Sequence, residues 1–569
     1  MSSCAPVGNR RNLPPRTDQC SRYRCFRPES SISRRVAPSN PAPSSLTIAF
    51  DGRVDNREEL LAELAGSRTA GTDCELVLRA YQRWGEESTR HILGDFAYVV
   101  WNAQDRSLFC ARDHLGIRPF FYFTDGRAFL WASGPHQFFH HPAFRKRPNH
   151  AMIAEYLSAD LTSLEETLYQ GVLRLPPAHC LRVSAAGISK RRYWDVDLSR
   201  QVRHSTDAGY AESFQDVFAE AVRCRFRGTG PVAAELSGGV DSSSVVGMCR
   251  TLFQKGTVPE RGFETFSLVF PGQACDESAY VRKVVQFCSV TSNEVAVPPD
   301  HLWYANCAKT YSDLPDHANF HMSDFASDRA REKGFGVILT GLGGDDWFTG
   351  CPPPSRWSRV RRALRPLRRA LEGPACRRPS WIPAGFASRV GLGCTARSTQ
   401  PALRFASQTQ RLLYEGLSDP YRLHCLEMKA RASARCGVEH RHPLHDRRLI
   451  ELAFALPADQ FWRGGESKSV MRRTMAGLVP DAVINRRTKA EFSTTTAQLF
   501  ASDGIAPIFR SLLIAEQGWV DGPRVAIMYD EFMQAWRAGS EYLPRVWPLS
   551  MILGVELWFR AVFAEKVLL

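Results

Sequence analysis

Two glycine-rich loops that end in aspartate are the segments of this sequence most able to do chemistry. The first, LSGGVDSSS at residues 236–244, lies between a predicted strand and a predicted helix. Its consecutive backbone N–H groups and the helix N-terminus could hold a pyrophosphate, because glycines let the backbone approach closely. Asp241 then stands where a Mg²⁺ bound to phosphate oxygens needs a carboxylate. The loop lacks the lysine of the G-x-x-x-x-G-K-[ST] pattern, so a cation for the phosphates must come from elsewhere.

The second loop, TGLGGDD at residues 340–346, also follows an apolar strand. Because the carboxyl ends of parallel strands meet at one edge of a sheet, we expect the two loops to face each other there. Asp241 and Asp345 would then offer paired carboxylates to one or two Mg²⁺ ions. Gly-Gly followed by Asp is also common in plain turns, and it is the presence of both loops in this order that predicts a nucleotide site.

Alternating helices and buried strands must position the two loops. After a polar linker near residues 197–206, the pattern predicts helices at 208–226, 243–253 and 278–287 and strands at 232–236, 265–270, 294–297 and 336–340. Strands separated by helices predict an α/β fold with a parallel, doubly wound sheet and a ligand site at the strand carboxyl ends. We expect the remainder of this second domain, residues 207–569, to be mostly helical.

The first 200 residues follow another pattern. Residues 46–200 predict an α+β domain, with apolar runs at 46–50, 96–101, 120–123 and 128–132 and helices at 58–64 and 75–84. Residues 1–45 are rich in Ser, Pro and Arg and cannot bury enough apolar surface to offset their ordering entropy, which predicts a disordered basic extension.

A basic insertion around residues 352–404 interrupts the second domain. Over residues 356–378, arginines and regularly spaced apolar residues predict an amphipathic helix kinked at Pro366. This helix could dock an acidic substrate segment or could be an ordinary solvated surface, and the sequence leaves both open.

Bulk composition excludes several classes of protein. With 569 residues, 44% of them hydrophobic and 23% charged, the chain should be a soluble globular protein with more than one core. We see no apolar run near the roughly 18 residues that cross a bilayer, and no secretory signal. The 16 cysteines are scattered and form no C-x-x-C pair, which favours a reduced cytoplasmic protein over a disulfide, zinc or iron–sulfur protein. The net charge of +14 favours an anionic partner or reflects solvated arginines.

The motifs of both domains resemble those of the class B asparagine synthetase family and its relatives, the β-lactam synthetases and the lasso-peptide cyclases. The resemblance covers roughly residues 46–509. SGGVDSS matches the family's nucleotide loop, and TFSLVF resembles the strand that lines its adenine pocket, which places Leu268 against the base. GVEHRHPLHD resembles the family's GVEARVPFLD segment. RRTKAEFS resembles its R-x-K-x-x-F motif, whose lysine contacts the phosphates, so that Lys489 supplies the missing cation.

The resemblance implies ATP and Mg²⁺ as cofactors, an Ntn-type glutamine amidotransferase-like fold for the first domain and a PP-loop ATP-pyrophosphatase fold for the second. Lys489 would be catalytic, with Glu439 or Asp346 as the base if one is needed. Asp241 and Asp345 would bind the metal. The residues expected to bind the nucleotide are Leu236, Ser237, Gly238, Gly239, Asp241, Ser242, Ser243, Leu268 and Gly341.

Two departures from the family decide the expected reaction. The amidotransferase needs a cysteine at residue 2 as nucleophile, and its glutamine is bound by Asn-Gly-Glu. This chain has Ser2, and the second motif reads Asp51–Gly52–Arg53, so we expect glutamine hydrolysis to be lost. Leu342 stands where asparagine synthetases carry glutamate and β-lactam synthetases carry tyrosine. Leucine can neither take a proton nor orient an amine.

These features favour a lasso-peptide cyclase. ATP would activate an Asp or Glu side chain of a precursor peptide, and the peptide's N-terminal amine would displace AMP to close a macrolactam. Expected partners are the precursor peptide, a transglutaminase-like leader protease and a leader-binding protein, with no membrane or nucleic-acid partner. The alternative is an ammonia-dependent asparagine synthetase or another small-molecule amide synthetase. A tRNA-modifying ATP pyrophosphatase usually needs a catalytic cysteine near the nucleotide, and a dead binding protein would not need Asp241, Asp345 and Lys489.

Overall fold

The structure is a computed structural model, and it describes residues 24–25, 45–64, 71–228, 230–260, 262–297, 301–315, 322–352, 378–392, 403–540, 543 and 545–564. Most of the predicted extension at 1–45 lies outside these residues. So does most of the basic insertion, including the amphipathic helix predicted at 356–378.

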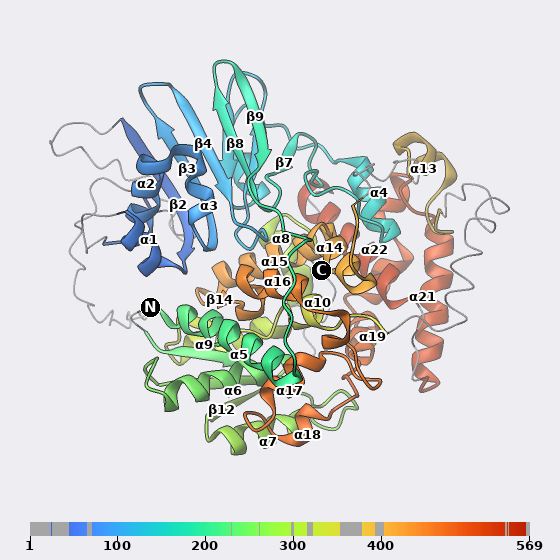
Figure 1. Ribbon diagram of the computed structural model, residues 1–569. Coiled ribbons are helices and arrows are strands. Elements are labelled where there is room, and N and C mark those ends of the chain that lie inside the picture. Colours follow the sequence, from blue (N-terminus) through green and yellow to red (C-terminus); the bar gives the residue numbers. More distant parts are fainter. Residues whose placement is uncertain are drawn as a thin grey trace, which may run out of the picture.

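The N-terminal domain consists of two mainly antiparallel sheets with helices packed against them (Figure 1). A six-stranded sheet has the order β1-β2-β3-β4-β8-β9, and a three-stranded sheet has the order β6-β5-β7. The strands are β1 (Arg24–Cys25), β2 (Leu46–Val54), β3 (Gly94–Asn102), β4 (Ser107–Arg112), β5 (Phe121–Thr124), β6 (Phe129–Ala132), β7 (Val172–Arg174), β8 (His179–Ser184) and β9 (Gly187–Arg192). The helices are α1 (Arg57–Glu63), α2 (Asp73–Trp84), α3 (Ser88–His91) and α4 (His150–Ser158). The four predicted strands and both predicted helices are confirmed to within a few residues.

The close pairing of β2 with β3 fixes the position of Arg53. In this antiparallel ladder Arg53 lies opposite Asp95, and Gly52 lies opposite Phe96. Gly52 has a φ of +146°, and a Cβ there would lie 2.1 Å from the carbonyl oxygen of Asp95, so a side chain would not fit. The Arg53 side chain is therefore held at the end of the sheet, where it is buried.

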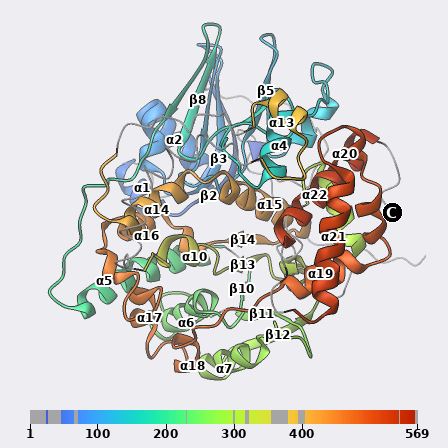
Figure 2. The same ribbon diagram turned by 90° about the vertical axis from the view of Figure 1, so that its right-hand side faces the viewer.

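The second domain contains a five-stranded sheet of order β12-β11-β10-β13-β14, in which all neighbours are parallel. Figure 2 shows these strands in succession, below the N-terminal sheets. They are β10 (Val232–Glu235), β11 (Glu264–Val269), β12 (Thr291–Ala296), β13 (Val337–Leu339) and β14 (Glu439–Arg441). The predicted parallel α/β sheet is confirmed, although β14 was not predicted as a strand.

Helices cover both faces of this sheet. On one face, the inward residues of β10 pack against α5 (Asp207–Arg223), α6 (Val240–Gln254) and α7 (Ser278–Cys288). On the other face, Ala233, Phe266 and Ile338 pack against α9 (Ser323–Glu332) and α15 (Pro420–Cys436). The alternation along each strand thus separates two cores. Neighbouring residues of one strand therefore point to opposite faces of the sheet.

Shorter helices complete the second domain. Near the sheet lie α10 (Gly344–Phe348), α14 (Gln408–Leu417), α16 (Arg447–Ala455), α17 (Ser469–Met475) and α18 (Asp481–Ile484). A third core joins α4 to α8 (His301–Tyr311), α13 (Ala384–Val390), α19 (Ser493–Ala501), α20 (Leu513–Glu516), α21 (Gly522–Arg537) and α22 (Val546–Phe559). The prediction of a mostly helical C-terminal region is confirmed.

The last described helix is unusually apolar. Val546–Ala564 has a mean hydropathy of 1.4 and is the one helix in the described part of the chain that is long and apolar enough to cross a bilayer. From the sequence we expected no apolar run of this length. However, 67% of it is buried inside the protein, where Leu549, Ile552 and Leu553 are fully enclosed. It is therefore a core helix of this fold.

Candidate active site

The loop after β10 is closed by one hydroxyl group. Ser242 Oγ accepts a hydrogen bond from the backbone N–H of Ser237 at 3.1 Å and lies 3.0 Å from Ser237 Oγ. Gly238 has a φ of +74°, and a Cβ there would lie 2.7 Å from the Cβ of Tyr280. Helix α6 begins at Val240, so its first N–H groups have no acceptor within the helix. The loop can therefore present several N–H groups to a phosphate.

The loop after β13 packs directly on the first loop. A Cβ at Gly344 would lie 2.2 Å from the carboxylate of Asp241, and a Cβ at Gly341 would lie 2.5 Å from the backbone nitrogen of Ser242. Because both glycines leave room for the other loop, Asp241 and Asp345 come together at the carboxyl edge of the sheet. The two loops therefore face each other as the sequence predicts.

Two lysines meet these carboxylates. Lys468 Nζ lies 2.6 Å from Asp241 Oδ2 and 2.7 Å from Asp345 Oδ1, and its side chain is 9% exposed. Lys489 Nζ lies 2.6 Å from Asp345 Oδ2, but its side chain is 81% exposed. The sequence favours Lys489 at the phosphates and leaves Lys468, at a probable helix start, as a competing candidate expected to lie behind it. The structure places Lys468 there as well, at the N-terminus of α17 with a left-handed φ of 59°.

The two carboxylates have different electrostatic environments. Burial raises the pKa of Asp345, but the positive charges of Lys468 and Lys489 lower it by a larger amount. The pKa of Asp345 therefore lies well below its ordinary value. Burial raises the pKa of Asp241 above its ordinary value, and the charge of Asp345 adds to this effect. Asp241 Oδ1 is buried and has no hydrogen-bond partner among the described residues. An oxygen of this kind is suited to a hard cation.

Mg²⁺ fits this donor set. Asp241 and Asp345 supply carboxylate oxygens from two loops, and one of those oxygens lacks a partner. They would hold the ion against the phosphates, where it would neutralise negative charge and act as a Lewis acid. Lys468 lies between the same two carboxylates, so it would share their charge with the ion.

A pocket with an empty volume of about 500 Å³ opens beside the phosphate loop. Its walls are largely apolar, as a purine ring requires, and Leu268 is among them, on the strand where the sequence expects it. Leu236 and Ser237 line the pocket and also begin the loop, so one ligand could occupy both. The lining residues are Glu235, Leu236, Ser237, Phe266, Leu268, Phe270, Cys275, Glu277, Ser323, Ala326 and Phe492.

Glu439, one of the two predicted bases, does not lie with the two glycine-rich loops. Glu439 is the first residue of β14, at the amino end of the parallel sheet, whereas the nucleotide loops leave the carboxyl ends. Its carboxylate contacts three guanidinium groups, those of Arg53, Arg118 and Arg441. Burial would raise its pKa, but these arginines hold the pKa well below its ordinary value. A carboxylate so stabilised in its charged form is a poor proton acceptor.

Asp346, the other predicted base, lies beside the second loop. Its Oδ2 is 3.5 Å from Nε2 of His445, a buried histidine that sequence reasoning missed. His445 Nδ1 lies 3.0 Å from the carbonyl oxygen of Leu342, so the histidine supports the loop that carries both residues. Burial lowers the pKa of His445 to about 4, which keeps its ring neutral. The sequence did carry a sign of His445, because GVEHRHPLHD has this histidine where the family segment GVEARVPFLD has leucine.

The domain interface holds Arg53, the residue of the Asp51–Gly52–Arg53 motif that departs from Asn-Gly-Glu. Arg53 donates to Asp55 at 2.6 Å, to Asp95 at 3.0 Å and, across the interface, to Glu439 at 3.3 Å. Arg118 donates to the same Glu439 at 2.9 Å. Arg53 is thus fully engaged in a buried network, and its guanidinium is not available to a small ligand.

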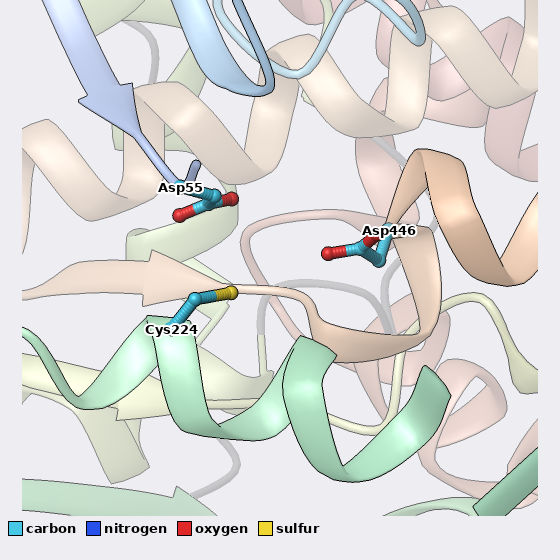
Figure 3. A group of neighbouring side chains, drawn as sticks. All are labelled: Asp55, Cys224 and Asp446. Carbon is cyan, nitrogen blue, oxygen red and sulfur yellow. The ribbon is translucent and has the colours of Figure 1, made fainter. Parts of the chain in front are cut away.

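Asp55, Cys224 and Asp446 also gather at this interface (Figure 3), with one ligand atom from each within 4.8 Å of the others. Their charges are already matched, because Arg53 donates to Asp55 and Arg225 donates to Asp446 at 2.8 Å. Burial raises the pKa of the Cys224 thiol to about 12, whereas a metal ligand must be a thiolate. The group is therefore a structural contact.

Comparison with known proteins identifies the family. The Asparagine synthase family profile matches residues 213–560, which is more than half of the chain. The chain belongs to this family. A Glutamine amidotransferase domain profile matches residues 36–194. As a member of the asparagine synthase family, the protein is an ATP-dependent carbon–nitrogen ligase, with an Ntn-type amidotransferase fold ahead of a PP-loop domain.

Named relatives agree with this assignment at low identity. Asparagine synthetase [glutamine-hydrolyzing] 3 of Bacillus subtilis is 26% identical over 470 residues, which cover 78% of this chain and 74% of the relative. Amidase chyE of Penicillium rubens is 28% identical and covers 55% of this chain. A putative asparagine synthetase of Methanocaldococcus jannaschii is 26% identical and covers 54% of this chain. This chain spans 48% of the length of the amidase and 59% of that of the archaeal relative.

Proposed function

We propose that this ligase adenylates a side-chain carboxylate of a peptide and joins it to that peptide's own N-terminal amine, without hydrolysing glutamine. The observation that carries the proposal is the buried network of Arg53. At the position where related amidotransferases bind glutamine, this chain has a guanidinium committed to Asp55, Asp95 and Glu439. The amine must then come from another source.

The carboxyl-edge loops suit the first half-reaction. With the nucleotide triphosphate on the first loop, an incoming carboxylate oxygen attacks the α-phosphorus, and the bond to pyrophosphate breaks. Loop N–H groups and the ammonium groups of Lys468 and Lys489 would stabilise the charge that develops on the phosphate oxygens. Asp241 and Asp345 are the ligands proposed for Mg²⁺.

The second half-reaction needs little chemistry from the protein. The acyl-adenylate is a mixed anhydride, so an amine held close to its carbonyl carbon displaces AMP. Leu342 is partly buried at the second loop and packs against the main core, which gives the amine an apolar neighbour. Asp346, partly exposed on the same loop, is the group we assign to take the proton that the amine loses.

The substrate class that fits best is a lasso-type precursor peptide. An intramolecular amine explains both the altered glutamine-binding position and Leu342. We expect the precursor peptide, a transglutaminase-like leader protease and a leader-binding protein as partners in a cytoplasmic pathway. Ammonia-dependent synthesis of asparagine is the second candidate, because the Bacillus subtilis relative is named an asparagine synthetase.

One experiment separates the two. The full chain is incubated with ATP and Mg²⁺, either with short peptides encoded beside its gene or with aspartate and ammonium. We expect pyrophosphate release with a peptide, and a product that has lost one molecule of water. Asparagine formed from aspartate and ammonium, with no peptide product, would overturn the peptide proposal.

A further inference from the structure

Glu235 is an unexpected side chain in the pocket beside the phosphate loop. It is the last residue of β10 and stands two residues before Ser237, where the loop begins. Phe266, Leu268 and Phe492 are among the walls of the pocket, so Glu235 places a carboxylate beside apolar surface. It shares its face of the sheet with Ala233, because alternate residues of a strand point to the same side.

One oxygen of this carboxylate lacks a partner. Glu235 Oε1 is buried and has no hydrogen-bond partner among the described residues. Burial raises the pKa of Glu235, and the nearby charge of Lys429 opposes that rise without removing it. A buried acceptor without a donor costs free energy that a ligand could offset. The pocket is therefore incomplete until a donor enters it.

No ion pair among the described residues engages Glu235, although the charges of Lys429 and Asp324 both act on its carboxylate. The other acid of the pocket, Glu277, is bound to Arg486 at 2.6 Å. Lys429 donates to the hydroxyl of Ser323, which lines the same pocket. Glu235 is thus the carboxylate in this lining whose oxygen is left for a bound molecule.

We propose that Glu235 is a specificity-determining residue that accepts a hydrogen bond from the exocyclic 6-amino group of adenine. The inference rests on the proposed assignment of this edge of the sheet to ATP. A nucleotide whose phosphates lie on the loop from Ser237 to Asp241 would place its flat base between the aromatic and aliphatic walls. The 6-amino group is a donor in adenine, whereas the 6-oxo group of hypoxanthine is an acceptor and would be repelled by the carboxylate.

The test is equilibrium binding of nucleotides to the full chain in the presence of Mg²⁺. The probes are ATP, purine riboside triphosphate, which lacks the 6-amino group, and 2′-deoxy-ATP. We expect the unmodified chain to bind ATP about 10- to 100-fold more tightly than purine riboside triphosphate, the range for a hydrogen bond to a charged acceptor. Glu235→Leu should remove this preference, by weakening ATP and leaving purine riboside triphosphate nearly unchanged.

Two further variants control for shape and folding. Glu235→Gln keeps an acceptor oxygen and should retain part of the preference. Glu264→Gln alters an acid at the amino end of β11, outside the pocket, and should leave all three affinities unchanged. Unfolding temperatures confirm that each variant is folded.

Other outcomes would overturn the inference. If Glu235→Leu weakens ATP and purine riboside triphosphate equally, the carboxylate does not contact the 6-amino group. If Glu235→Leu instead loses a preference of the unmodified chain for ATP over 2′-deoxy-ATP, Glu235 binds the ribose 2′-hydroxyl. Failure of the unmodified chain to bind ATP at all would sink the nucleotide assignment itself, which is a different result from either of these.

Discussion

Arg53 and Glu439 are 386 residues apart in the chain, and their side chains meet at 3.3 Å across the domain interface. The contact joins the end of β2 in the N-terminal sheet to the first residue of β14 in the parallel sheet. Both groups are charged and largely buried, so removing either one would leave an unpaired buried charge and destabilise the fold. The interface is therefore built on a residue at which the sequence departs from the motif that it resembles.

Glutamine should not be hydrolysed by this protein. Arg53 is held by Asp55, Asp95 and Glu439, and a positive group in place of a carboxylate cannot bind the α-ammonium of glutamine. We expect no glutamate release from glutamine above background, measured by a coupled glutamate assay. Turnover of glutamine by the purified chain would contradict this account of the interface.

Glu439→Gln should destabilise the protein in a pH-dependent way. The folded-state pKa of Glu439 lies below its ordinary value of 4.5, so its stabilisation is fully present above that value and is lost as pH falls through the folded pKa. At neutral pH the substitution should cost about 3 kcal/mol, as expected for a buried ion pair. The difference from the unmodified chain should shrink below about pH 4.5 in denaturant titrations. A constant difference down to pH 3 would exclude the charge as the cause.

Asp241→Asn and Asp345→Asn should each abolish ATP–pyrophosphate exchange while leaving the fold intact. Both side chains are assigned to Mg²⁺, and an amide oxygen is a weaker ligand than a carboxylate. Asp459→Asn is the matched control, because that side chain is 55% exposed, close to the 56% of Asp345, and pairs with Arg463. Exchange at the unmodified rate in either site variant would show that the residue is not a ligand.

Lys489→Ala should slow the single-turnover rate of adenylation by about 100-fold, because it removes a cation from the developing phosphate charge. ATP affinity should change far less. Lys489→Arg should recover only part of the rate, since a planar guanidinium does not reproduce a compact ammonium.

Lys468→Ala tests the second cation. This lysine is buried between Asp241 and Asp345, so its loss leaves two facing carboxylates, and we expect weaker ATP binding and a lower unfolding temperature. If Lys468→Ala instead binds ATP normally and gives the slower turnover of the two, Lys468 is the catalytic cation.

Leu342→Glu should impair peptide cyclisation more than adenylation. Leu342 packs against an apolar core beside the second loop, and a charge there would bind an ammonium rather than leave a reactive amine. Leu342→Met, which keeps the surface apolar, is the control and should retain both steps. Equal loss of adenylation and cyclisation in Leu342→Glu would show that Leu342 acts in nucleotide binding rather than in amine binding.

Local patterns were enough to predict that the two glycine-rich loops meet at one edge of the sheet. Glycines followed by aspartate after apolar strands mark both loops, and the structure brings Asp241 and Asp345 together as expected. Strand β9 was missed because its residues, GISKRR, are nearly all exposed and carry no apolar alternation. Strand β14 was missed because it has three residues, two of them charged, and owes its strand form to pairing with β13.

Contacts between distant segments could not be predicted in the same way. Glu439 was assigned to the site by its motif, but which end of the sheet it occupies depends on the register between β13 and β14. Lys468 lies 227 residues after Asp241, and their contact depends on how α17 packs against α5 and α6. No pattern near Lys468 records that packing.

The clearance between Gly344 and Asp241 has a consequence for engineering this ligase. With only 2.2 Å between a hypothetical Cβ and the carboxylate, a second loop that carries a side chain at position 344 cannot be introduced unless the first loop moves to accommodate it. Chimeras that recombine between β10 and β13 would pair loops of different origin, whereas exchange of both loops together would keep the fit. Libraries that vary substrate choice should therefore treat residues 236–244 and 340–346 as one inherited unit.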